Sequence, residues 1–359
     1  MSTEKNPTSL SEMIKSSGEW MRGTGPEAEI VISSRVRLAR NIRGFRFITK
    51  MDATERASCE TLIQNAILDA KIAQPNMYMP LHKSEGLDRK FLVERHLISK
   101  EHEDAQHHRG VAIGENEAVA IMVNEEDHIR LQVLQSGFQL PEAWKICNRI
   151  DDELEQRLEY SFSPQLGYLT ACPTNVGTGM RVSVMLHLPA LVLTRHIEKV
   201  FQAVGKINLA VRGLYGEGTE ASGHFYQISN QVTLGRTEDE IVKNVQDVIP
   251  TIVGYEHRAR QSLLSKDRKR LEDRVWCAYG MLKYKHVLPS DEAMMLLSAV
   301  RMGVHLGLIK DLSLRTVNEL FIFTQPAHLQ KLTGRALEPM ERDIKRADFV
   351  RAKLAQCKH

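Results

Sequence analysis

The feature that most constrains this chain is a run of three acidic residues directly after an apolar segment. Residues 118–123 read Ala-Val-Ala-Ile-Met-Val and predict a buried strand, which is followed by Asn124 and then by Glu125, Glu126 and Asp127. Three adjacent carboxylates repel each other and lose hydration when they leave water. Such a run is therefore either a solvated turn or a carboxylate site for a cation, a metal or a guanidinium group.

The composition excludes several classes of protein. The 359 residues are enough for two domains, and 48 basic against 45 acidic residues give a formal net charge of +3, which does not favour a nucleic-acid or membrane partner. No apolar run is long enough to span a membrane, and the polar N-terminus lacks the apolar core of a signal peptide. Five widely spaced cysteines without a Cys-x-x-Cys pair argue against a disulfide framework and a cysteine zinc site. We expect a soluble cytoplasmic protein.

A strand is also predicted at 30–40, where an apolar start leads into alternating arginines. Arg35 and Arg37 project from the same face of such a strand because side chains alternate between its two faces. Two parallel guanidinium groups repel each other unless an anion lies between them, and phosphate oxygens match their geometry. The alternative is a basic strand that faces solvent.

Strand and helix signals alternate through the first 260 residues. Helices are predicted at 10–21, 52–73, 141–159, 189–203 and 237–264, and further strands at 91–93, 131–137, 206–212 and 225–230. The segment 100–110 carries His102, His107 and His108 among acidic residues. We expect a mobile polar loop there rather than a metal site, because the spacing of these histidines is not diagnostic.

A second dense stretch runs through 167–181. A strand is predicted to end at Cys172, and a Pro-Thr-Asn sequence with a glycine-rich turn then leads to Arg181. The stretch is not a Walker loop, because Gly-x-x-x-x-Gly-Lys-Ser/Thr is absent. Cys172 is either an inert buried cysteine or a positioned thiolate. Another glycine-rich loop begins at Arg212 and carries Glu217.

The character of the chain changes near residue 265, after which strand signals disappear. Basic helices are predicted at 267–285, 291–305, 314–323 and 338–356, so we predict a catalytic domain over 1–260 and a helical domain over 267–359. In the last helix Arg342 and Arg346 are neighbours on one face, with Asp343 alongside. A solvated helix with local ion pairs would show the same spacing.

The charged residues of the first domain suit transfer of a phosphoryl group onto a cationic acceptor. Arginines and a Mg²⁺ ion would neutralise the phosphates of a triphosphate donor, and positioning would carry most of the rate. Carboxylates would hold a guanidinium group, and one of them would accept its proton. The residues concerned are Arg35, Arg37, Arg130, Arg181, Arg212, Glu126 and Glu217.

Four separate motifs resemble the signatures of the ATP:guanido phosphotransferases. They lie at 33–37, 124–128, 172–178 and 212–220, in the order of that family, and the resemblance covers roughly 30–255. It implies an α+β fold with an antiparallel sheet flanked by helices, which the all-α C-terminal domain follows.

The resemblance also implies the roles of individual residues. Glu126 and Glu217 would clamp the acceptor guanidinium, one of them as the base, and Cys172 would orient and polarise it as a thiolate. No metal site formed by the protein alone is implied. The residues implied to bind ATP are Ser33, Ser34, Arg35, Val36, Arg37, His96, Arg130, Arg181, Val182, Ser183, Val184, Met185, Arg212, Gly213, Leu214, Tyr215 and Gly216.

Departures from the creatine and arginine kinases point to one branch of the family. Only about thirty residues precede the first arginine motif, where those enzymes carry a helical domain, and Tyr215 stands where arginine kinases have a further arginine. The added C-terminal helices resemble those of the bacterial protein arginine kinases. An open acceptor site would admit a polypeptide rather than a free amino acid.

The C-terminal residues Arg342, Asp343, Arg346 and Ala347 match the Arg-Asp-x-x-Arg-Ala motif of that branch. The motif implies a phosphoarginine pocket that regulates activity, in which an arginine grips the phosphoryl group and Asp343 holds the guanidinium. The resemblance further implies a homodimer, protein substrates bearing arginine, a zinc-binding activator protein, a Clp-type unfoldase and protease, and a stress-response repressor as a target. A small-molecule guanidino kinase and a silent phosphoarginine-binding adaptor are the alternatives.

Overall fold

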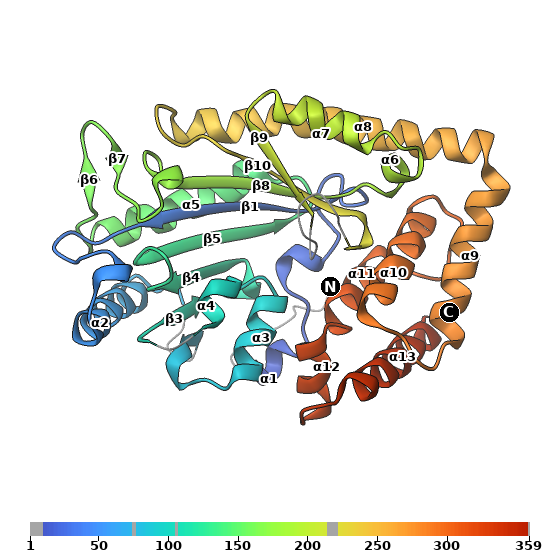
Figure 1. The fold of residues 1–359 in the computed structure, drawn as a ribbon, viewed down its shortest axis with the longest axis horizontal. Coiled ribbons are helices and arrows are strands. Elements are labelled where there is room, and N and C mark those ends of the chain that lie inside the picture. The colour runs from blue at the N-terminus through green and yellow to red at the C-terminus, as the bar shows by residue number, and fades with distance from the viewer. Residues whose placement is uncertain (1–9, 74–76, 105–106, 214–221, 358–359) are drawn as a thin grey trace.

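A central antiparallel sheet organises the computed structural model, which describes residues 10–73, 77–104, 107–213 and 222–357 (Figure 1). Eight strands follow the order β2-β3-β4-β5-β1-β8-β10-β9, and every neighbouring pair is antiparallel. This confirms the predicted sheet. The strands are β1 (Val31–Arg40), β2 (Tyr78–Pro80), β3 (Gly110–Ile113), β4 (Val119–Val123), β5 (Ile129–Ser136), β8 (Met180–His187), β9 (Leu209–Gly213) and β10 (Phe225–Asn230), with β6 (Phe162–Ser163) and β7 (Gly167–Tyr168) in a separate hairpin.

Helices flank the sheet and then form the whole C-terminal region. Within the described parts of the chain, no helix has the length and apolar character needed to cross a membrane. The helices are α1 (Leu10–Met13), α2 (Ala53–Asp69), α3 (Gly86–Glu94), α4 (Lys100–Glu103), α5 (Leu140–Glu155), α6 (Pro189–Leu193), α7 (Ile197–Gly205), α8 (Glu238–Lys266), α9 (Arg268–Tyr284), α10 (Ser290–His305), α11 (Leu314–Phe323), α12 (Pro326–Thr333) and α13 (Pro339–Gln356).

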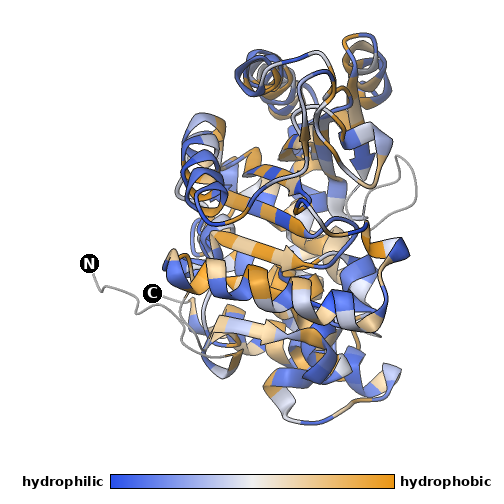
Figure 2. Ribbon diagram, turned by 90° about the vertical axis from the view of Figure 1, so that its left-hand side faces the viewer, coloured by the Kyte–Doolittle hydropathy of each residue, from blue (hydrophilic) through white to orange (hydrophobic). Residues whose placement is uncertain are grey.

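One face of the sheet is apolar and packs against α5 and α8. The alternation of β1 and β8 sends Val36, Leu38, Val182 and Val184 to this face, where all four are fully buried. Figure 2 shows many hydrophobic residues along the central strands, while the outer helices carry many hydrophilic residues. The opposite face of the same strands is left to polar side chains.

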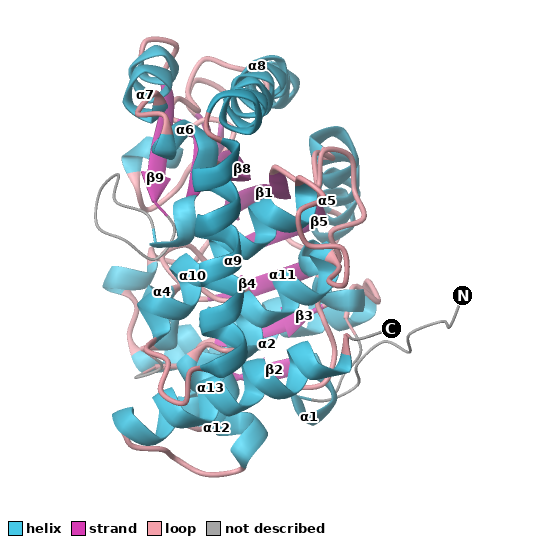
Figure 3. Cartoon of the chain, turned by 90° about the vertical axis from the view of Figure 1, so that its right-hand side faces the viewer, coloured by secondary structure: helices cyan, strands magenta, loops and turns pink. Residues whose placement is uncertain are grey.

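The C-terminal helices are attached to the sheet by buried polar contacts. Figures 1 and 3 show α9–α13 gathered at one end of the sheet, beyond the long helix α8. Arg301 of α10 donates hydrogen bonds to the carbonyl oxygens of Ala28 at 2.6 Å and Glu29 at 2.8 Å, just before β1. Glu94 of α3 accepts hydrogen bonds from the amides of Ala327 and His328, which lie at the start of α12. The predicted division at 260–267 falls at the end of α8 and remains a prediction.

Several local predictions differ from the structure. The apolar run Phe91 to Val93 belongs to helix α3 rather than to a strand, because a short apolar run does not distinguish a buried helix from a strand. The helix predicted over 189–203 is divided into α6 and α7 around Arg195, which has a positive φ of 59°. Ahead of Cys172 only the two-residue strand β7 forms. Strands β2, β3 and β8 and helix α12 were not predicted.

Candidate active site

Strand register gathers the arginines on the polar face of the sheet. In the antiparallel pairs, Arg37 lies opposite Arg181 of β8, and Arg130 of β5 lies opposite Ala39 of β1. Residues directly opposite each other share a face of the sheet. On β9, Arg212 lies opposite Gln227 of β10 and so joins the same surface.

These side chains line one cleft with a volume of about 170 Å³. It brings together six of the residues singled out from the sequence, contributed by β1, β5, β8, β9, the turn after β4 and the segment after β7. They are Arg37, Glu126, Arg130, Cys172, Arg181 and Arg212. The cleft is therefore cationic, and one carboxylate and one thiol also line it.

Arg35 and Arg37 of β1 form no ion pair with an acidic residue in the described part of the chain, whereas Arg40 at the end of the strand pairs with Asp151. Arg37 is half-buried, and its Nε atom is buried without a hydrogen-bond partner among the described residues. Desolvation, followed by repulsion from Arg35, Arg130 and Arg181, lowers the pKa of Arg37 well below its usual value. A cationic group in this position is stabilised when an anion enters the cleft.

Neighbouring polar side chains hold Arg35 in place. Its Nη2 donates a hydrogen bond to Gln227 Oε1 at 2.6 Å, and its Nε donates to Ser183 Oγ at 3.4 Å. Burial and the charge of Arg130 lower the pKa of Arg35 to about 10, so it stays charged near neutral pH. Because neither contact neutralises the charge, Arg35 adds to the positive potential beside the cleft.

The three acidic residues after β4 have three different environments. Glu125 is buried and forms an ion pair with Arg130 of β5 and a hydrogen bond with the Ser99 hydroxyl. Burial alone would raise the pKa of Glu125, but Arg130 and Ser99 hold it at about 2. Glu125 thus fixes one wall of the arginine cleft.

Glu126 is the exposed member of the acidic run and the one that lines the cleft. Burial of part of the side chain, with repulsion from Asp127 and Glu125, raises its pKa above the ordinary 4.5, although Arg130 opposes the shift. A carboxylate with a raised pKa accepts a proton more readily near neutral pH. Its position and basicity suit a general base.

Asp127 and His128 are buried and connect the acidic turn to other segments. Asp127 Oδ1 accepts hydrogen bonds from Asn41 Nδ2 and from the Ala171 amide, both at 2.6 Å. The His128 ring accepts at Nδ1 from the Ile42 amide and contacts the Arg46 carbonyl through Nε2, both at 2.9 Å. These residues position the turn and were not assigned such a role from the sequence.

The segment that carries Cys172 forms a short turn that lines the cleft. Cys172 Sγ lies 3.1 Å from the hydroxyl of Thr174, and Thr170 donates a hydrogen bond to the Cys172 carbonyl. Arg181 donates to Asn175 Oδ1 at 3.3 Å and to the Asn230 carbonyl at 3.0 Å. The segment thus places the thiol beside a cleft arginine.

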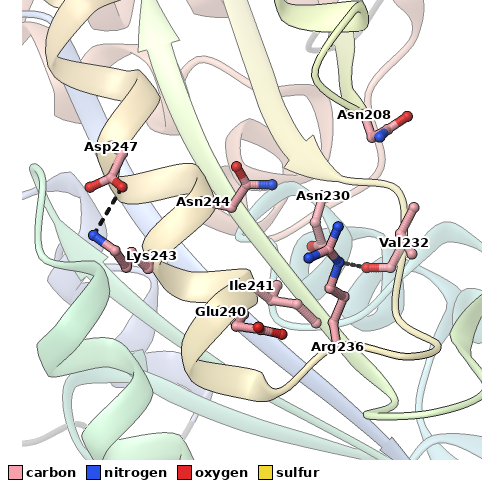
Figure 4. A pocket seen from close by; sticks show the side chains of 9 residues that line it. All are labelled: Asn208, Asn230, Val232, Arg236, Glu240, Ile241, Lys243, Asn244 and Asp247. Atoms are coloured by element: carbon pink, nitrogen blue, oxygen red, sulfur yellow. Dashed lines mark hydrogen bonds and ion pairs between the residues drawn. The ribbon is translucent and has the colours of Figure 1, made fainter.

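Asn230 contacts Arg181 of the cleft and also lines a second polar pocket, shown in Figure 4. Asn230 Oδ1 accepts from the Val182 amide at 2.8 Å, and its carbonyl accepts from Arg181. The pocket of about 290 Å³ is bounded by α8, where Lys243 and Asp247 form an ion pair at 3.2 Å. Asn230 therefore helps to fix the Arg181 side chain through its carbonyl, a role that the sequence did not indicate.

The remaining residues expected to bind ATP divide into several groups. Ser33 and Met185 lie opposite each other on the face that carries Arg35, whereas Val36, Val182 and Val184 point into the core. The Ser34 hydroxyl is buried and donates to the Gly137 carbonyl while it accepts from the Gln139 amide. Any contact of these core-facing residues with a nucleotide would therefore come from their backbone.

His96 lies beside the arginine face, at the end of α3. Its ring packs edge-on against Trp20 with centroids 5.0 Å apart, and burial together with Arg35 lowers its pKa to about 3. It is therefore neutral near pH 7. Gly213 ends β9, and the expected site residues Leu214, Tyr215, Gly216 and Glu217 lie outside the described residues.

The C-terminal motif lies in the first turns of α13. Arg346 is buried and donates hydrogen bonds to the carbonyl oxygens of Thr324 and Leu288, both at 2.8 Å, and to Asp343 at 2.6 Å. Arg342 is half-buried and donates to the Leu337 carbonyl at 3.1 Å, and Ala347 is buried. Arg346 therefore supports Asp343 from inside the fold, while Arg342 and Asp343 retain some exposure.

A cleft that gathers four arginines, of which Arg130 has an acidic partner, next to a basic carboxylate and a thiol suits a phosphotransferase. Comparison with known protein families also indicates a phosphotransferase. Residues 58–259 match the model of the ATP:guanido phosphotransferase C-terminal catalytic domain, and residues 268–359 match that of the protein-arginine kinase McsB C-terminal domain.

Similar proteins extend over nearly the whole chain. It is 49% identical to the protein-arginine kinase of Symbiobacterium thermophilum, covering 95% of this chain and 98% of that one, and 45% identical to that of Bacillus subtilis, covering 93% of each. Among solved structures, lombricine kinase is similar with a TM-score of 0.57, 26% identity and 74% of each chain covered. The duplicated taurocyamine kinase of Schistosoma mansoni has a TM-score of 0.58 and 29% identity, covering 72% of this chain and 37% of that one.

The chain belongs to the ATP:guanido phosphotransferase family and, within it, to the protein-arginine kinases. The resemblance inferred from four short motifs is confirmed. ATP is the phosphoryl donor that the family implies.

Proposed function

We propose that this cleft transfers the γ-phosphoryl group of ATP to arginine side chains of protein substrates. The observation that carries the proposal is the buried Nε of Arg37, which has no hydrogen-bond partner among the described residues and lies in the cleft that Glu126 lines. An anion site and a base within one cleft suit a reaction between a nucleotide phosphate and a guanidinium group. The 45–49% identity to protein-arginine kinases supports a protein rather than a metabolite as the acceptor.

In the proposed reaction, a terminal nitrogen of the substrate guanidinium attacks the γ-phosphorus. A P–N bond forms, the bond from the γ-phosphorus to the bridging oxygen breaks, and ADP leaves with that electron pair. Glu126 accepts the proton that the nitrogen loses, which its raised pKa favours. Glu217, outside the described residues, would be the second carboxylate of the clamp.

The arginines of the cleft would hold the phosphates. Arg37, Arg130 and Arg181 converge on it from three adjacent strands, and fixed positive groups stabilise the charge of the transferring phosphoryl group. Arg130 is held by its buried partner Glu125 and needs little reorganisation. Cys172, beside Arg181, would orient the guanidinium as a thiolate.

A Mg²⁺ ion would accompany the nucleotide. Among the described residues the cleft offers one carboxylate, Glu126, and several arginines, which is a poor donor set for a magnesium ion bound by the protein alone. The cleft fits an ion that arrives on the oxygens of the triphosphate. When bound, the ion neutralises phosphate charge.

The C-terminal motif would form a pocket for phosphoarginine. Asp343, held by buried Arg346, would accept hydrogen bonds from a guanidinium, and Arg342 would bind the phosphoryl group. The product of the reaction would then regulate the enzyme. The enzyme would act in the cytoplasm as a homodimer, together with a zinc-binding activator protein. It would mark proteins for a Clp-type unfoldase and protease and would inactivate a stress-response repressor. These partners and targets rest on the family resemblance alone.

The first experiment is to incubate the purified chain with Mg-ATP and casein and to locate the phosphate by mass spectrometry at neutral pH, because the P–N bond is labile in acid. Free arginine serves as a parallel acceptor. Phosphate on casein arginines, with free arginine unmodified, is the expected result. Turnover of free arginine alone would instead make the chain a small-molecule kinase like its structural neighbours, and no transfer would favour the silent adaptor.

Two variants test the site itself. Glu126→Ala should nearly abolish transfer while ATP binding is retained, because Glu126 lines the cleft without supporting the arginines. Exposed Glu142 at the start of α5 provides the matched control, Glu142→Ala, which should leave transfer unchanged. Activity near that of the unmodified enzyme in Glu126→Ala would refute the assignment of Glu126.

A further inference from the structure

A group of potential metal ligands lies at the β2–β3 edge of the sheet and is not part of the kinase cleft. Glu60 projects from α2, His82 from the turn 81–83, and His108 from the segment just before β3. Glu60 Oε2 lies 3.3 Å from His108 Nδ1 and 3.9 Å from His82 Nδ1. All three candidate ligand atoms lie within 4.8 Å of one another.

This spacing is close to that of a tetrahedral metal centre. Zinc bonds to imidazole nitrogen and carboxylate oxygen are about 2.0–2.2 Å long, which places neighbouring ligand atoms roughly 3.3 Å apart around the ion. The Glu60–His108 distance already has this value, and a small rotation of the half-buried His82 ring would bring its Nδ1 closer. Two histidines and one carboxylate are a ligand set that zinc uses with a water in the fourth position.

The His82 ring shows the clearest need for a further partner. Its Nδ1 atom is buried and makes no hydrogen bond within the described part of the chain, although it points toward Glu60. The ring also lies against His108, with centroids 4.6 Å apart. Imidazole nitrogen atoms held this close to one carboxylate can bind the same cation.

The surroundings hold Glu60 in the orientation that a ligand needs. Tyr78, buried in β2, donates a hydrogen bond to Glu60 Oε1 at 3.2 Å and leaves Oε2 directed at the histidines. Gly110 permits this approach, because a Cβ atom there would lie 2.2 Å from Tyr78 Oη and 3.0 Å from Glu60 Oε1. A hydrogen-bonded carboxylate is the usual second-shell arrangement of a metal ligand.

We propose that Glu60, His82 and His108 bind one divalent transition-metal ion, with Zn²⁺ the best match to this ligand set. The site lies next to the catalytic turn, because the His108 carbonyl accepts a hydrogen bond from Asn124 Nδ2 at 2.9 Å. Asn124 directly precedes the three acidic residues and has a positive φ of 58°. A metal at His108 would therefore hold the backbone against which this turn is anchored.

The test is a titration of the purified, chelator-treated full chain with Co²⁺, whose visible spectrum reports coordination, followed by displacement with Zn²⁺. The expected result is one saturable ion per chain, without the thiolate charge-transfer band that a cysteine ligand would produce. His82→Ala and His108→Ala should weaken binding by more than the roughly 10–100-fold that loss of a second-shell partner costs. His107→Ala, at the exposed neighbouring histidine, is the matched control and should bind like the unmodified chain.

Thermal unfolding with and without Zn²⁺ provides a second measurement, because a ligand of the folded state raises the melting temperature. The melting temperature should rise in the unmodified chain and in His107→Ala, but not in His108→Ala. The His108 side chain is 42% exposed in the unmodified chain, so its truncation should leave the fold intact. Absence of a saturable ion, or equal binding by all three variants, would overturn the proposal. Neither measurement depends on kinase activity, so the result is independent of the proposed function.

Discussion

Asp127 joins the acidic turn to the segment that carries Cys172, because its Oδ1 accepts a hydrogen bond from the Ala171 amide at 2.6 Å. The same oxygen accepts from Asn41 Nδ2, so one buried carboxylate fixes three segments that are distant in the sequence. Glu126 precedes Asp127 and Cys172 follows Ala171, so this hydrogen bond helps to fix the positions of both residues in the cleft that they line. The relationship gives Asp127 a positioning role.

Asp127→Ala should therefore lower both stability and transfer. The Ala171 amide would lose a buried partner, which costs about 1–3 kcal/mol, and a shift of the reacting groups by about 1 Å can reduce the rate roughly 100-fold. Urea denaturation and kcat, measured at saturating ATP, test this. Asp69→Ala, at the exposed end of α2, is the control and should change neither. An unchanged kcat in Asp127→Ala would remove the positioning role.

Glu125 should stabilise the fold in a pH-dependent manner. Its pKa is about 2 in the folded protein, below the ordinary 4.5, so its contribution is complete above pH 4.5 and is lost as the pH falls toward 2. The difference corresponds to about 3 kcal/mol. Glu125→Gln should lose roughly this amount at pH 7 and less at pH 3 in urea denaturation. As a control, the exposed Glu126→Gln should lose little unfolding free energy at pH 7 or at pH 3. If Glu125→Gln lost the same unfolding free energy at pH 7 and at pH 3, the lowered pKa of Glu125 would be refuted.

Glu126 should determine the acid limb of the pH–rate profile. Because its pKa is raised, the carboxylate becomes protonated and inactive as a base at a pH above the ordinary value of 4.5. We expect kcat/KM to fall as the pH decreases toward the raised pKa of Glu126, while ATP binding persists. The residual activity of Glu126→Gln should lack this limb. A profile with the same limb in both proteins would assign it to another group.

Arg37 should favour function at the expense of stability. Arg37→Met removes a half-buried cation that three other arginines repel, so we expect a gain of about 1 kcal/mol in unfolding free energy. ATP affinity should fall about 10-fold or more, because a charge-assisted phosphate contact is lost. Calorimetry measures both effects. Arg212→Met, at an exposed position of the same cleft, should weaken ATP binding without the gain in stability.

The two arginines of the C-terminal motif should behave differently. Arg346→Ala would leave the Thr324 and Leu288 carbonyls and Asp343 without a buried partner, so a loss of about 2–4 kcal/mol in unfolding free energy is expected. Arg342→Ala should change stability by less than about 0.5 kcal/mol. Under the proposed function, both variants should lose binding of a phosphoarginine peptide in calorimetry. Unchanged binding in Arg342→Ala would place the phosphoryl contact elsewhere.

Local patterns in the sequence were sufficient for much of the fold and part of the cleft. The period of two along 30–40 placed Arg35 and Arg37 on one face, and the structure confirms this strand. Helix α11 was predicted with the observed bounds, because its apolar spacing is regular. In contrast, the run at Phe91 is too short for its period to be read, and it forms a helix.

The sequence by itself therefore determined which side chains share a strand face and which chemical groups are available, since both depend on neighbours in the chain. Tertiary structure decided which acid faces the cleft, because the buried partners of Glu125 and Asp127 come from Arg130 and Ala171. It also decided that Glu60, His82 and His108 meet. Such contacts depend on strand register and on the packing of distant segments, neither of which a local pattern specifies.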